Sequence, residues 1–419
     1  MMNKTNIKRF IKRFDFARDA YAKIRAATQS YDIPEIYEMN IRKSIFNDKM
    51  RINLLVPSVN QEHVFGGIST ALTFFDDLKN EVQCDARIIT VDAEVNHKTV
   101  LSEEYKIVNA ADDSKEKYQL VSFANRNDKT VPVREKDVFV ATAWWTAYII
   151  KEIIIKQADL YKQRKKPFIY LIQDFEPGFY PWSSKYLLSE STYAHDADVW
   201  AVFNSEELSD YFNNNHYRFQ NQWVFQPVFN RKLKEILLNS KKMVVKKKKI
   251  LIYGRPNTPR NAFEFIIEGL KKWALRQKDI HEWEVYSAGE KHANINIGNG
   301  IVIKPVGKLS LKDYAAMLKE SFVGISLMVS PHPSYPPLEM SVFGMKTITN
   351  VYHNKNLQYF NDNIINLEFN TPENLALTLE RLCNGFNSEA QLLIDNRFVK
   401  ENNQFFNIVK DIHSKLFLI

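Results

Sequence analysis

The chain contains two successive series of short apolar runs separated by amphipathic stretches. The first series is residues 52–57, 87–91, 137–142, 167–173, 198–203 and 222–227, and the second is 249–254, 283–289, 301–307, 322–329 and 346–351. Continuous apolar strands between helical patterns are typical of parallel sheets covered by helices on both faces. The pattern predicts an α/β fold with two doubly wound, Rossmann-like domains. Their strand carboxyl ends would face each other across a ligand-binding cleft.

The ends of the chain and one internal run suggest the domain boundaries. Residues 1–45 begin with a basic amphipathic stretch, IKRFIKRF, and we expect a helical extension there. It would either pack on the body of the protein or lie in a lipid interface. We expect α/β domains over 46–240 and 241–396, with a helix over 397–419 that packs back on the first domain. The lysine-rich run 239–250 is predicted to be an exposed linker.

Composition narrows the class of protein. At 419 residues the chain is too long for one ordinary core, and its net charge of +8 favours partners that carry phosphate or other anions. No nucleic-acid-binding signature accompanies the charge, so a nucleic-acid partner is not expected. Cys84 and Cys383 have no metal-type spacing, and no apolar run is long enough to span a bilayer. We expect a cytoplasmic protein, peripheral at the inner face of the membrane if its first helix touches lipid.

Cations follow two strands of the second series. Thr258 is a favourable N-cap and Pro259 a favourable first helical residue, so a helix is predicted to start there, flanked by Arg255 and Arg260. Guanidinium groups beside a helix N-terminus favour a diphosphate. Lys308 follows a later strand and adds a third cation, although surface arginines and lysines would give the same pattern.

A stiff loop, SPHPSYPPLE, leads from a strand into a helix. Its four prolines fix the backbone around Ser334 and Tyr335, whose N–H groups we expect to face an anion. Glu339, expected in the first helical turn, would accept hydrogen bonds from sugar hydroxyls. The alternative is that Glu339 only complements its own helix dipole.

The first series supplies polar and aromatic residues at corresponding strand ends. Gly66 and Gly67 follow the first strand and would allow close approach of a ligand. The residues after the strand 167–173 combine amide, carboxylate and aromatic groups: Gln173, Asp174, Glu176, Tyr180 and Trp182. Such a combination would hold a sugar acceptor, or it would be an aromatic core cluster with acids at the surface.

Together these motifs resemble the GT-B glycosyltransferases of the retaining family-4 type. Gly254-Arg255, Val306 to Lys308 and Pro336 to Glu339 occur in that family's order, and Q-D-F-E-P with the proline-rich loop is similar to the WsaF type of S-layer glycan rhamnosyltransferases. The resemblance implies a dTDP-rhamnose donor bound at its diphosphate by Arg255 with Lys308 or Arg260, and at its ribose by Glu339. It implies a lipid-linked glycan acceptor and no required cofactor. Pro331 replaces the first acid of the family's E-x7-E motif.

The implied reaction is transfer of a glycosyl group to a hydroxyl with retention and without a metal. Asp174 is the candidate general base, with His195 as a second candidate. Two alternatives stay open. Asp196-Ala197-Asp198 could hold a metal as D-x-D does in GT-A transferases, and the protein could be a non-catalytic carbohydrate- or nucleotide-binding protein.

Overall fold

The computed structural model describes residues 31–417 except 48, 65, 125–128, 195–197 and 401–404. Residues up to Glu38 form one unit, in which the short 3-10 helix η1 (Pro34–Ile36) is described, and Met39 onward form a second. The predicted basic helix over residues 1–30 lies outside the described residues. No helix within the described ranges combines the length and apolar character that a bilayer crossing requires.

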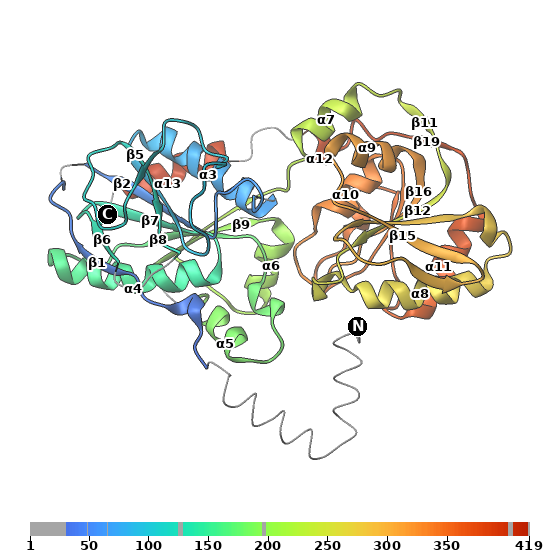
Figure 1. Cartoon of the computed structure of the whole chain (residues 1–419), viewed down its shortest axis with the longest axis horizontal. Coiled ribbons are helices and arrows are strands. Elements are labelled where there is room, and N and C mark those ends of the chain that lie inside the picture. Colours follow the sequence, from blue (N-terminus) through green and yellow to red (C-terminus); the bar gives the residue numbers. More distant parts are fainter. Residues whose placement is uncertain are drawn as a thin grey trace, which may run out of the picture. The chain divides into compact units, whose positions relative to one another are not determined.

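The second unit begins with an α/β domain around an eight-stranded sheet (Figure 1). Its strands are β1 (Asn40–Lys43), β2 (Arg51–Val56), β3 (Asp85–Thr90), β4 (Lys106–Val108), β5 (Tyr118–Ser122), β6 (Thr130–Val133), β7 (Asp137–Ala141), β8 (Phe168–Ile172), β9 (Val199–Asn204) and β10 (Asn221–Phe225). Its helices are α3 (Gly66–Val82), α4 (Trp144–Tyr161), η2 (Glu176–Phe179), α5 (Ser184–Ser191) and α6 (Glu206–Asn214). The sheet order is β10-β9-β8-β7-β2-β3-β5-β4, with β1 and β6 paired separately.

A second α/β domain follows, around a seven-stranded sheet of order β14-β15-β13-β12-β16-β17-β18. Its strands are β11 (Met243–Val245), β12 (Lys247–Gly254), β13 (Glu284–Gly289), β14 (Ile295–Gly298), β15 (Ile301–Gly307), β16 (Ser321–Ile325), β17 (Lys346–Thr349), β18 (Ile364–Asn366) and β19 (Glu389–Gln391). Its helices are α7 (Arg231–Leu238), η3 (Pro259–Asn261), α8 (Phe263–Arg276), η4 (Ile280–Glu282), α9 (Leu311–Glu320), α10 (Tyr335–Val342), η5 (Leu357–Phe360), α11 (Pro372–Asn384) and α12 (Arg397–Lys400).

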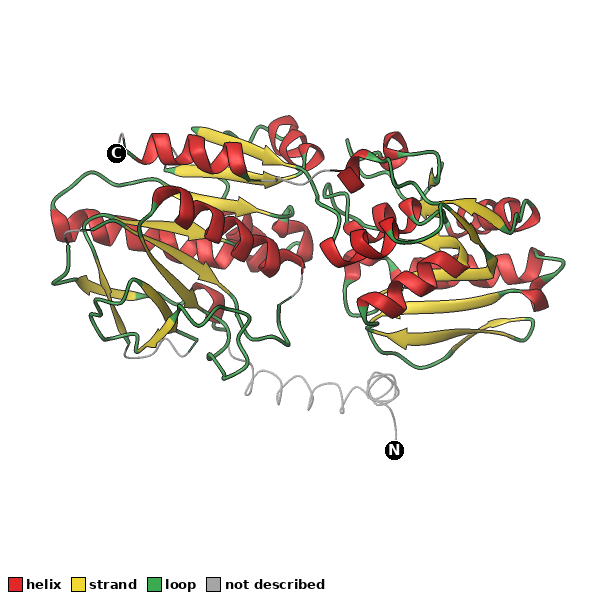
Figure 2. Cartoon of the chain, turned by 90° about the horizontal axis from the view of Figure 1, so that it is seen from above, coloured by secondary structure: helices red, strands yellow, loops and turns green. Residues whose placement is uncertain are grey.

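Both main sheets are parallel apart from β14, which pairs antiparallel with β15. Helices cover both faces of each sheet (Figure 2), and the central strands are buried over their whole length. Each domain therefore has the doubly wound arrangement that the apolar runs predicted. Parallel strands end at one edge of their sheet, and that edge is where such sheets bind ligands.

The last helix, α13 (Phe406–Leu416), belongs to the core of the first domain. Ile408, Val409 and Ile412 are buried with apolar residues of α3 and the first sheet, beside which α13 lies in Figure 1. The preceding α12 packs in the core of the second domain instead, through Phe398 and Val399. Thus the expected continuous helix over 397–419 is divided into two, one for each domain.

The domain boundaries differ from those expected. Residues 40–43 form strand β1 paired with β6, so the first domain starts before residue 46. Leu233 and Leu237 of α7 are buried in the core of the second domain, so the change of domain comes after β10 and not at residue 240. Helix α7 belongs to the second domain because its apolar face, with Leu233 and Leu237, is buried there.

The lysine run is only partly the exposed linker that was expected. Met243 to Val245 pair with β19, and β12 starts at Lys247. Lys246 between them is buried, and its Nζ donates to the carbonyl oxygens of Leu318 at 2.9 Å and Phe343 at 2.8 Å. Burial lowers the pKa of Lys246 to about 7. This lysine therefore satisfies carbonyl groups at the ends of α9 and α10.

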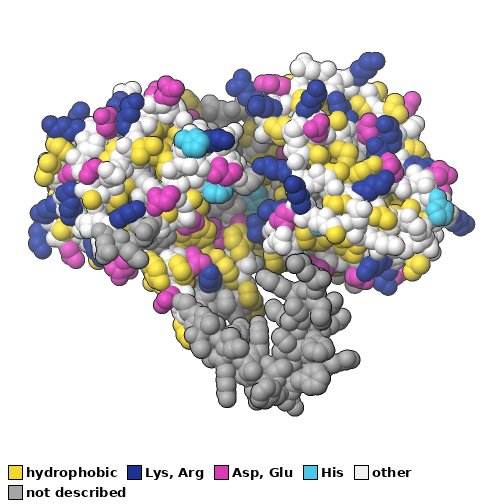
Figure 3. Space-filling view, in the orientation of Figure 1, with side chains coloured by type: hydrophobic (Ala, Val, Ile, Leu, Met, Phe, Trp, Pro, Cys, Tyr) yellow, Lys and Arg dark blue, Asp and Glu magenta, His cyan; other side chains and the backbone are white. Residues whose placement is uncertain are grey.

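Charged side chains are mixed on the surface. On the face shown in Figure 3, lysine and arginine side chains are interspersed with acidic ones over both domains. Most of the net charge lies instead in residues 1–30, which carry eight Lys and Arg against two Asp and Glu.

Candidate active site

Asp174 follows the carboxyl end of β8 and is held by residues of the second domain. Its Oδ1 accepts hydrogen bonds from the Phe175 N–H at 2.8 Å and from the Ser330 hydroxyl, and its Oδ2 lies 3.7 Å from Arg260 Nε. Only 7% of Asp174 is exposed. The carboxylate is thereby fixed between a strand end of the first domain and two loops of the second.

Arg260 is the cation of this cluster. Its guanidinium carbon lies 4.2 Å from the ring centroid of Phe179, and its carbonyl oxygen accepts from Val329 N–H at 2.7 Å. Its Nε is buried and has no hydrogen-bond partner among the described residues. A ligand could therefore reach only the exposed part of the Arg260 side chain, which is 27% exposed, and not its Nε.

The helix expected to start at Pro259 starts later. Residues 259–261 form the 3-10 turn η3, and α8 begins at Phe263 after Ala262, which has a left-handed φ of 50°. The Thr258 hydroxyl does not cap a helix but donates to Glu290 Oε1 at 3.1 Å. Arg260 consequently lies in the turn that precedes α8.

Arg255 follows β12 and is held by Glu290, which follows the neighbouring strand β13. Arg255 Nε lies 3.2 Å from Glu290 Oε1, and Glu290 Oε2 accepts from Asn257 N–H at 2.8 Å. Burial alone would raise the pKa of Glu290, but the bonds from Asn257 and Thr258 and the charge of Arg255 lower it below its ordinary value. No sequence motif indicated that Glu290 belongs to the site. The one feature that could have indicated it is its position directly after the strand β13.

Lys308 comes to the same sheet edge. β15, which Gly307 ends with a φ of 64°, pairs with β13, and β13 pairs with β12. The carboxyl ends of these three parallel strands thus place Arg255, Glu290 and Lys308 along one edge. Ser310 caps α9 as predicted, since its hydroxyl accepts from Asp313 N–H at 3.2 Å.

The proline-rich loop is ordered by its own side chains. His332 N–H donates to the Ser330 hydroxyl at 3.0 Å, and Ser334 N–H donates to His332 Nδ1 at 3.0 Å. The Ser334 N–H is therefore already used, contrary to the expectation that it faces an anion. Burial lowers the pKa of His332 to about 4, with the charges of Lys355 and Arg260 adding to the effect and that of Asp174 opposing it. The ring is neutral near pH 7, and its Nε2 is buried without a partner among the described residues.

Helix α10 carries Tyr335 and Glu339. Burial raises the pKa of Tyr335, and the neighbouring side chains of Asn204 and Thr70 in the first domain oppose the rise. Glu339 lies in the second turn of α10 and not in the first, so it does not complement the N-terminal dipole as that alternative required. Burial raises the pKa of Glu339 to about 7, and its interaction with the Tyr314 hydroxyl lowers the value in part.

The residues expected on the acceptor side are divided between interior and surface. Glu176 is 7% exposed, and its carboxylate accepts from the Trp144 N–H and, at 3.3 Å, from the Tyr170 hydroxyl. Burial raises the pKa of Glu176 to about 8, with a further rise from the charge of Asp174. Glu176 is thus buried to the same extent as Asp174 and is held by Trp144 and Tyr170, and its assignment to the acceptor stays a prediction.

Gln173 packs against the glycine pair. A Cβ atom added to Gly67 would lie 3.2 Å from Gln173 Oε1, whereas one added to Gly66 would meet nothing within 4 Å. Gly67 therefore permits the close approach of Gln173, and Gly66 begins α3 in open space. The Gln173 Oε1 atom is buried and has no partner among the described residues.

Tyr180 and Trp182 lie farther along the same loop. The Tyr180 hydroxyl accepts from Trp144 Nε1 at 2.9 Å. Trp182 is 93% exposed and stacks on Tyr186 with ring centroids 5.5 Å apart and an interplanar angle of 13°. Trp182 is thus the residue of this set that is presented to solvent.

Lys355 and Glu207 are polar residues near the site that the sequence motifs did not indicate. Lys355 is fully buried and donates to the Met328 carbonyl oxygen at 2.6 Å. Burial lowers the pKa of Lys355 to about 7, opposed by the charges of Asp174 and Glu207. Glu207, from the first domain, accepts from the Tyr359 hydroxyl of the second. Nothing in the run YHNK distinguishes this lysine from a surface one.

Asp198, the described residue of the D-x-D segment, lies at the opposite sheet edge. Asp198 immediately precedes β9 and pairs with Lys165, whereas Asp196 and Ala197 lie outside the described residues, as does His195. Among the residues that the structure describes, no group of three or more His, Cys, Asp or Glu could hold a metal ion.

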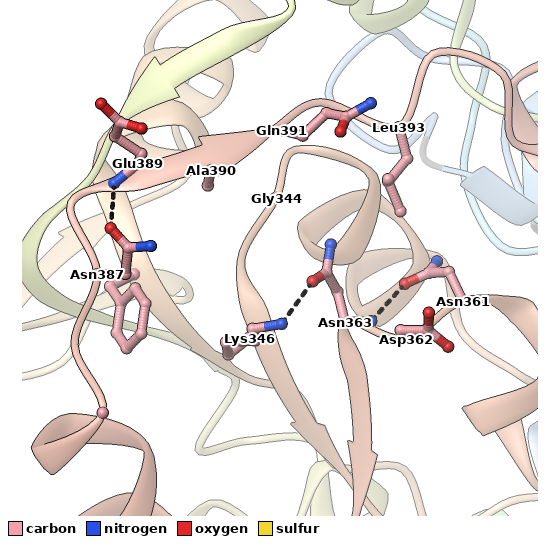
Figure 4. A pocket seen from close by; sticks show the side chains of 12 residues that line it. Gly344, Lys346, Asn361, Asp362, Asn363, Asn387, Glu389, Ala390, Gln391 and Leu393 are labelled. Carbon is pink, nitrogen blue, oxygen red and sulfur yellow. Dashed lines mark hydrogen bonds between the residues drawn. The ribbon is translucent and has the colours of Figure 1, made fainter.

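A polar recess of about 460 Å³ lies elsewhere in the second domain (Figure 4). Lys346, at the start of β17, lines it with Asn361, Asn363, Asn387 and Gln391. Lys346 Nζ donates to Asn363 Oδ1 at 3.0 Å. Because the recess lies at the amino ends of β16 and β17, it is at the other sheet edge from Arg255 and Lys308.

Two family models match the two domains. The model described as "WsaF, N-terminal domain" matches residues 51–206, and "WsaF, C-terminal domain" matches residues 248–380. The chain belongs to the WsaF family. The WsaF-like glycosyltransferase assignment agrees with the resemblance drawn from the motifs in both domains.

One curated relative is the O-antigen biosynthesis protein RfbC of Myxococcus xanthus, 28% identical over 214 residues. The match covers 51% of this chain and 15% of the length of RfbC. The shared region is therefore a small part of that longer protein.

Solved structures show the same fold at low identity. Sucrose-phosphate synthase from Thermosynechococcus elongatus matches with a TM-score of 0.57 and 12% identity over 88% of this chain and 100% of that chain. An alpha,alpha-trehalose-phosphate synthase (UDP-forming) from Burkholderia xenovorans matches with a TM-score of 0.52 and 10% identity. The match covers 88% of this chain and 99% of that chain. The WsaF-like chain thus has the GT-B fold, with two Rossmann-like domains, and not the GT-A fold.

Proposed function

We propose that this protein transfers L-rhamnose from dTDP-rhamnose to a hydroxyl of a growing surface glycan, with retention of configuration and without a metal ion. Membership of the WsaF family and the similarity to RfbC, an O-antigen biosynthesis protein, support a role in glycan assembly. The observation that carries the proposal is the gathering of Arg255 and Lys308 at adjoining strand ends. A diphosphate is the natural ligand of such a pair.

The donor diphosphate would lie over the ends of β12, β13 and β15. Glu290 holds the Arg255 side chain at 3.2 Å and so keeps it extended toward this edge. When the anomeric C–O bond breaks, the dTDP group leaves with the electron pair, and these cations stabilise its charge in place of a metal. Glu339 would accept hydrogen bonds from the ribose hydroxyls.

We assign the role of general base to the carboxylate of Asp174. As the new glycosidic bond forms, the acceptor hydroxyl must lose its proton, and Asp174 is the proposed acceptor of that proton. Ser330 and Arg260 fix the orientation of the carboxylate. His332 accepts the Ser334 N–H through Nδ1, so its neutral ring carries the proton on Nε2 and can donate a hydrogen bond there but cannot take the proton. His195, the earlier second candidate, lies outside the described residues.

The choice of rhamnose rests on the composition of the loop. Pro331, Pro333 and Pro337 are buried, and Pro331 stands where the family pattern has an acid. Rhamnose lacks the 6-hydroxyl of hexose donors, so a less polar pocket suits it. The acceptor is proposed to be lipid-linked, with the basic residues 1–30 providing contact at the inner face of the membrane.

The test is transfer from dTDP-rhamnose to a rhamnose oligosaccharide, followed by dTDP release and by the mass of the acceptor. Arg255→Ala is expected to lose about 100-fold in activity, because a charge-assisted bond to phosphate contributes roughly 3 kcal/mol. Arg276→Ala is the matched control. Arg276 is similarly exposed, 40% against 37% for Arg255, and also pairs with a glutamate, Glu373.

The outcomes distinguish the assignments. Full activity of Arg255→Ala would refute the assignment of Arg255 to the donor diphosphate. Equal losses of activity in Arg255→Ala and Arg276→Ala would indicate a general effect of surface charge. If the wild-type protein binds dTDP-rhamnose but neither releases dTDP nor extends the acceptor, the non-catalytic carbohydrate- or nucleotide-binding alternative is correct.

A further inference from the structure

A series of aromatic rings begins beside Asp174. Phe175, next to Asp174, lies 5.1 Å from Tyr211, and Tyr211 lies 6.4 Å from Tyr352, measured between ring centroids. Tyr211 and Tyr352 thus continue the aromatic packing that begins at Phe175.

Trp182 and Tyr186 form a flat aromatic platform on the loop that follows Asp174 and on helix α5. The two rings are nearly parallel, at 13°, and Trp182 is 93% exposed. A large exposed apolar ring is unfavourable in water unless it has a partner, so an exposed Trp held flat by a second ring indicates a binding surface. Stacking on Tyr186 also restricts the Trp182 side chain, which lowers the entropy lost on binding.

The platform lies close to the reacting groups along the chain. The Phe179 ring contacts Arg260, and Trp182 is three residues farther on. Three residues span at most about 11 Å even when fully extended. A short chain of sugar units that starts at Asp174 can therefore reach the platform.

We propose that Trp182 and Tyr186 form a distal acceptor subsite that stacks on the apolar face of a pyranose ring, one or more units away from the reacting hydroxyl. This inference rests on the proposed function, because it assumes that the acceptor is a glycan chain. It explains how an enzyme that extends a polymer favours long acceptors over single sugars: the platform adds binding energy only when the chain is long enough to reach it.

The charge of the neighbouring helix favours a glycan over a lipid surface. α5 (SKYLLSES) has one cation, Lys185, and one anion, Glu190, and Glu190 accepts from the Tyr217 hydroxyl at 2.8 Å. A helix that lies in a lipid interface has a basic polar face instead. Leu187 on α5 is 66% exposed, so binding to lipid is included as an outcome of the test.

The experiment compares the wild type with Trp182→Ala, Trp182→Phe and Phe369→Ala. Phe369 is a matched control because it is an exposed aromatic residue of the second domain, 61% exposed. Binding of a rhamnose pentasaccharide and of free rhamnose is measured by calorimetry without donor, and the KM for acceptors of one to five units is measured with dTDP-rhamnose. Trp182→Ala should bind the pentasaccharide about tenfold more weakly, with a KM increase that grows with acceptor length. Trp182→Phe should recover most of the affinity.

Several results would overturn the inference. These are equal pentasaccharide binding by the wild type and Trp182→Ala, a loss that does not depend on acceptor length, or an equal loss in Phe369→Ala. Weaker binding of Trp182→Ala to anionic lipid vesicles with unchanged glycan binding would assign the platform to lipid. Because binding is measured without donor, the subsite can be confirmed even if transfer of rhamnose is not observed.

Discussion

Replacing Glu339 with Gln should stabilise the protein at alkaline pH and weaken nucleotide binding. Burial raises the pKa of the Glu339 carboxyl from 4.5 to about 7. A carboxyl whose pKa is higher in the folded state binds its proton more tightly there, so stability is lost as the pH rises from about 4.5 through about 7. A pKa shift of this size lowers the free energy of unfolding by about 3 kcal/mol at pH 8. This value is an upper limit because Glu339 retains some contact with solvent.

Glutamine has the same shape but does not ionise, so Glu339→Gln should avoid this loss. We expect its free energy of unfolding by urea to exceed that of the wild type at pH 8 and to approach it near pH 4.5. Binding of dTDP, measured by calorimetry at pH 8, should become about 10- to 100-fold weaker, because a carboxylate accepts stronger hydrogen bonds from ribose than an amide does. On this hypothesis the wild type retains a destabilising carboxylate because the nucleotide requires it.

Glu290→Gln is the matched control, since bonds from Asn257 and Thr258 and the Arg255 charge lower the pKa of the Glu290 carboxyl. It should decrease stability at pH 8, with the opposite sign to Glu339→Gln. The reasoning is refuted if Glu339→Gln is no more stable than the wild type at pH 8, or if the difference does not change with pH. Unchanged dTDP affinity would refute only the ribose assignment.

Two further predictions concern a buried lysine and a metal. Burial lowers the pKa of Lys246 to about 7, so the unfolded chain binds more protons between about pH 7 and 10.4, and wild-type stability should rise with pH in that window. Lys246→Met should lack this rise in urea midpoints measured at pH 7 and 9.5, and an equal rise in both proteins would contradict the assignment. Rhamnosyl transfer should be unchanged by EDTA, whereas a strict requirement for Mn²⁺ would restore the metal role of Asp196 and Asp198.

The apolar runs were sufficient to locate the central strands of both sheets. β7 and β12 overlap the expected runs almost completely, because strands buried on both faces must be apolar throughout. The short strands β4 and β19 were not predicted. Both strands are largely exposed. They adopt the strand conformation because they pair with β5 and β11, respectively, and not because of their own composition.

Candidate site residues were found from the same pattern, since parallel strands end at a common edge. Arg255 and Lys308 could be placed together because each follows an apolar run of the second series. The setting of Glu176 could not be foreseen, because no local pattern reveals it. Its carboxylate is held by the Trp144 N–H, 32 residues away in the sequence.

The sequence by itself determined the secondary structure of the two cores and the edge at which a ligand binds, because periodicity and strand direction are local properties. Only the tertiary structure decided the partners of each charge. Ser330 meets Asp174 across 156 residues, and Lys246 is buried, unlike exposed lysines in the same run, because two helices end beside it. The energy of a charge depends on its surroundings in space, and folding brings those surroundings from distant parts of the chain.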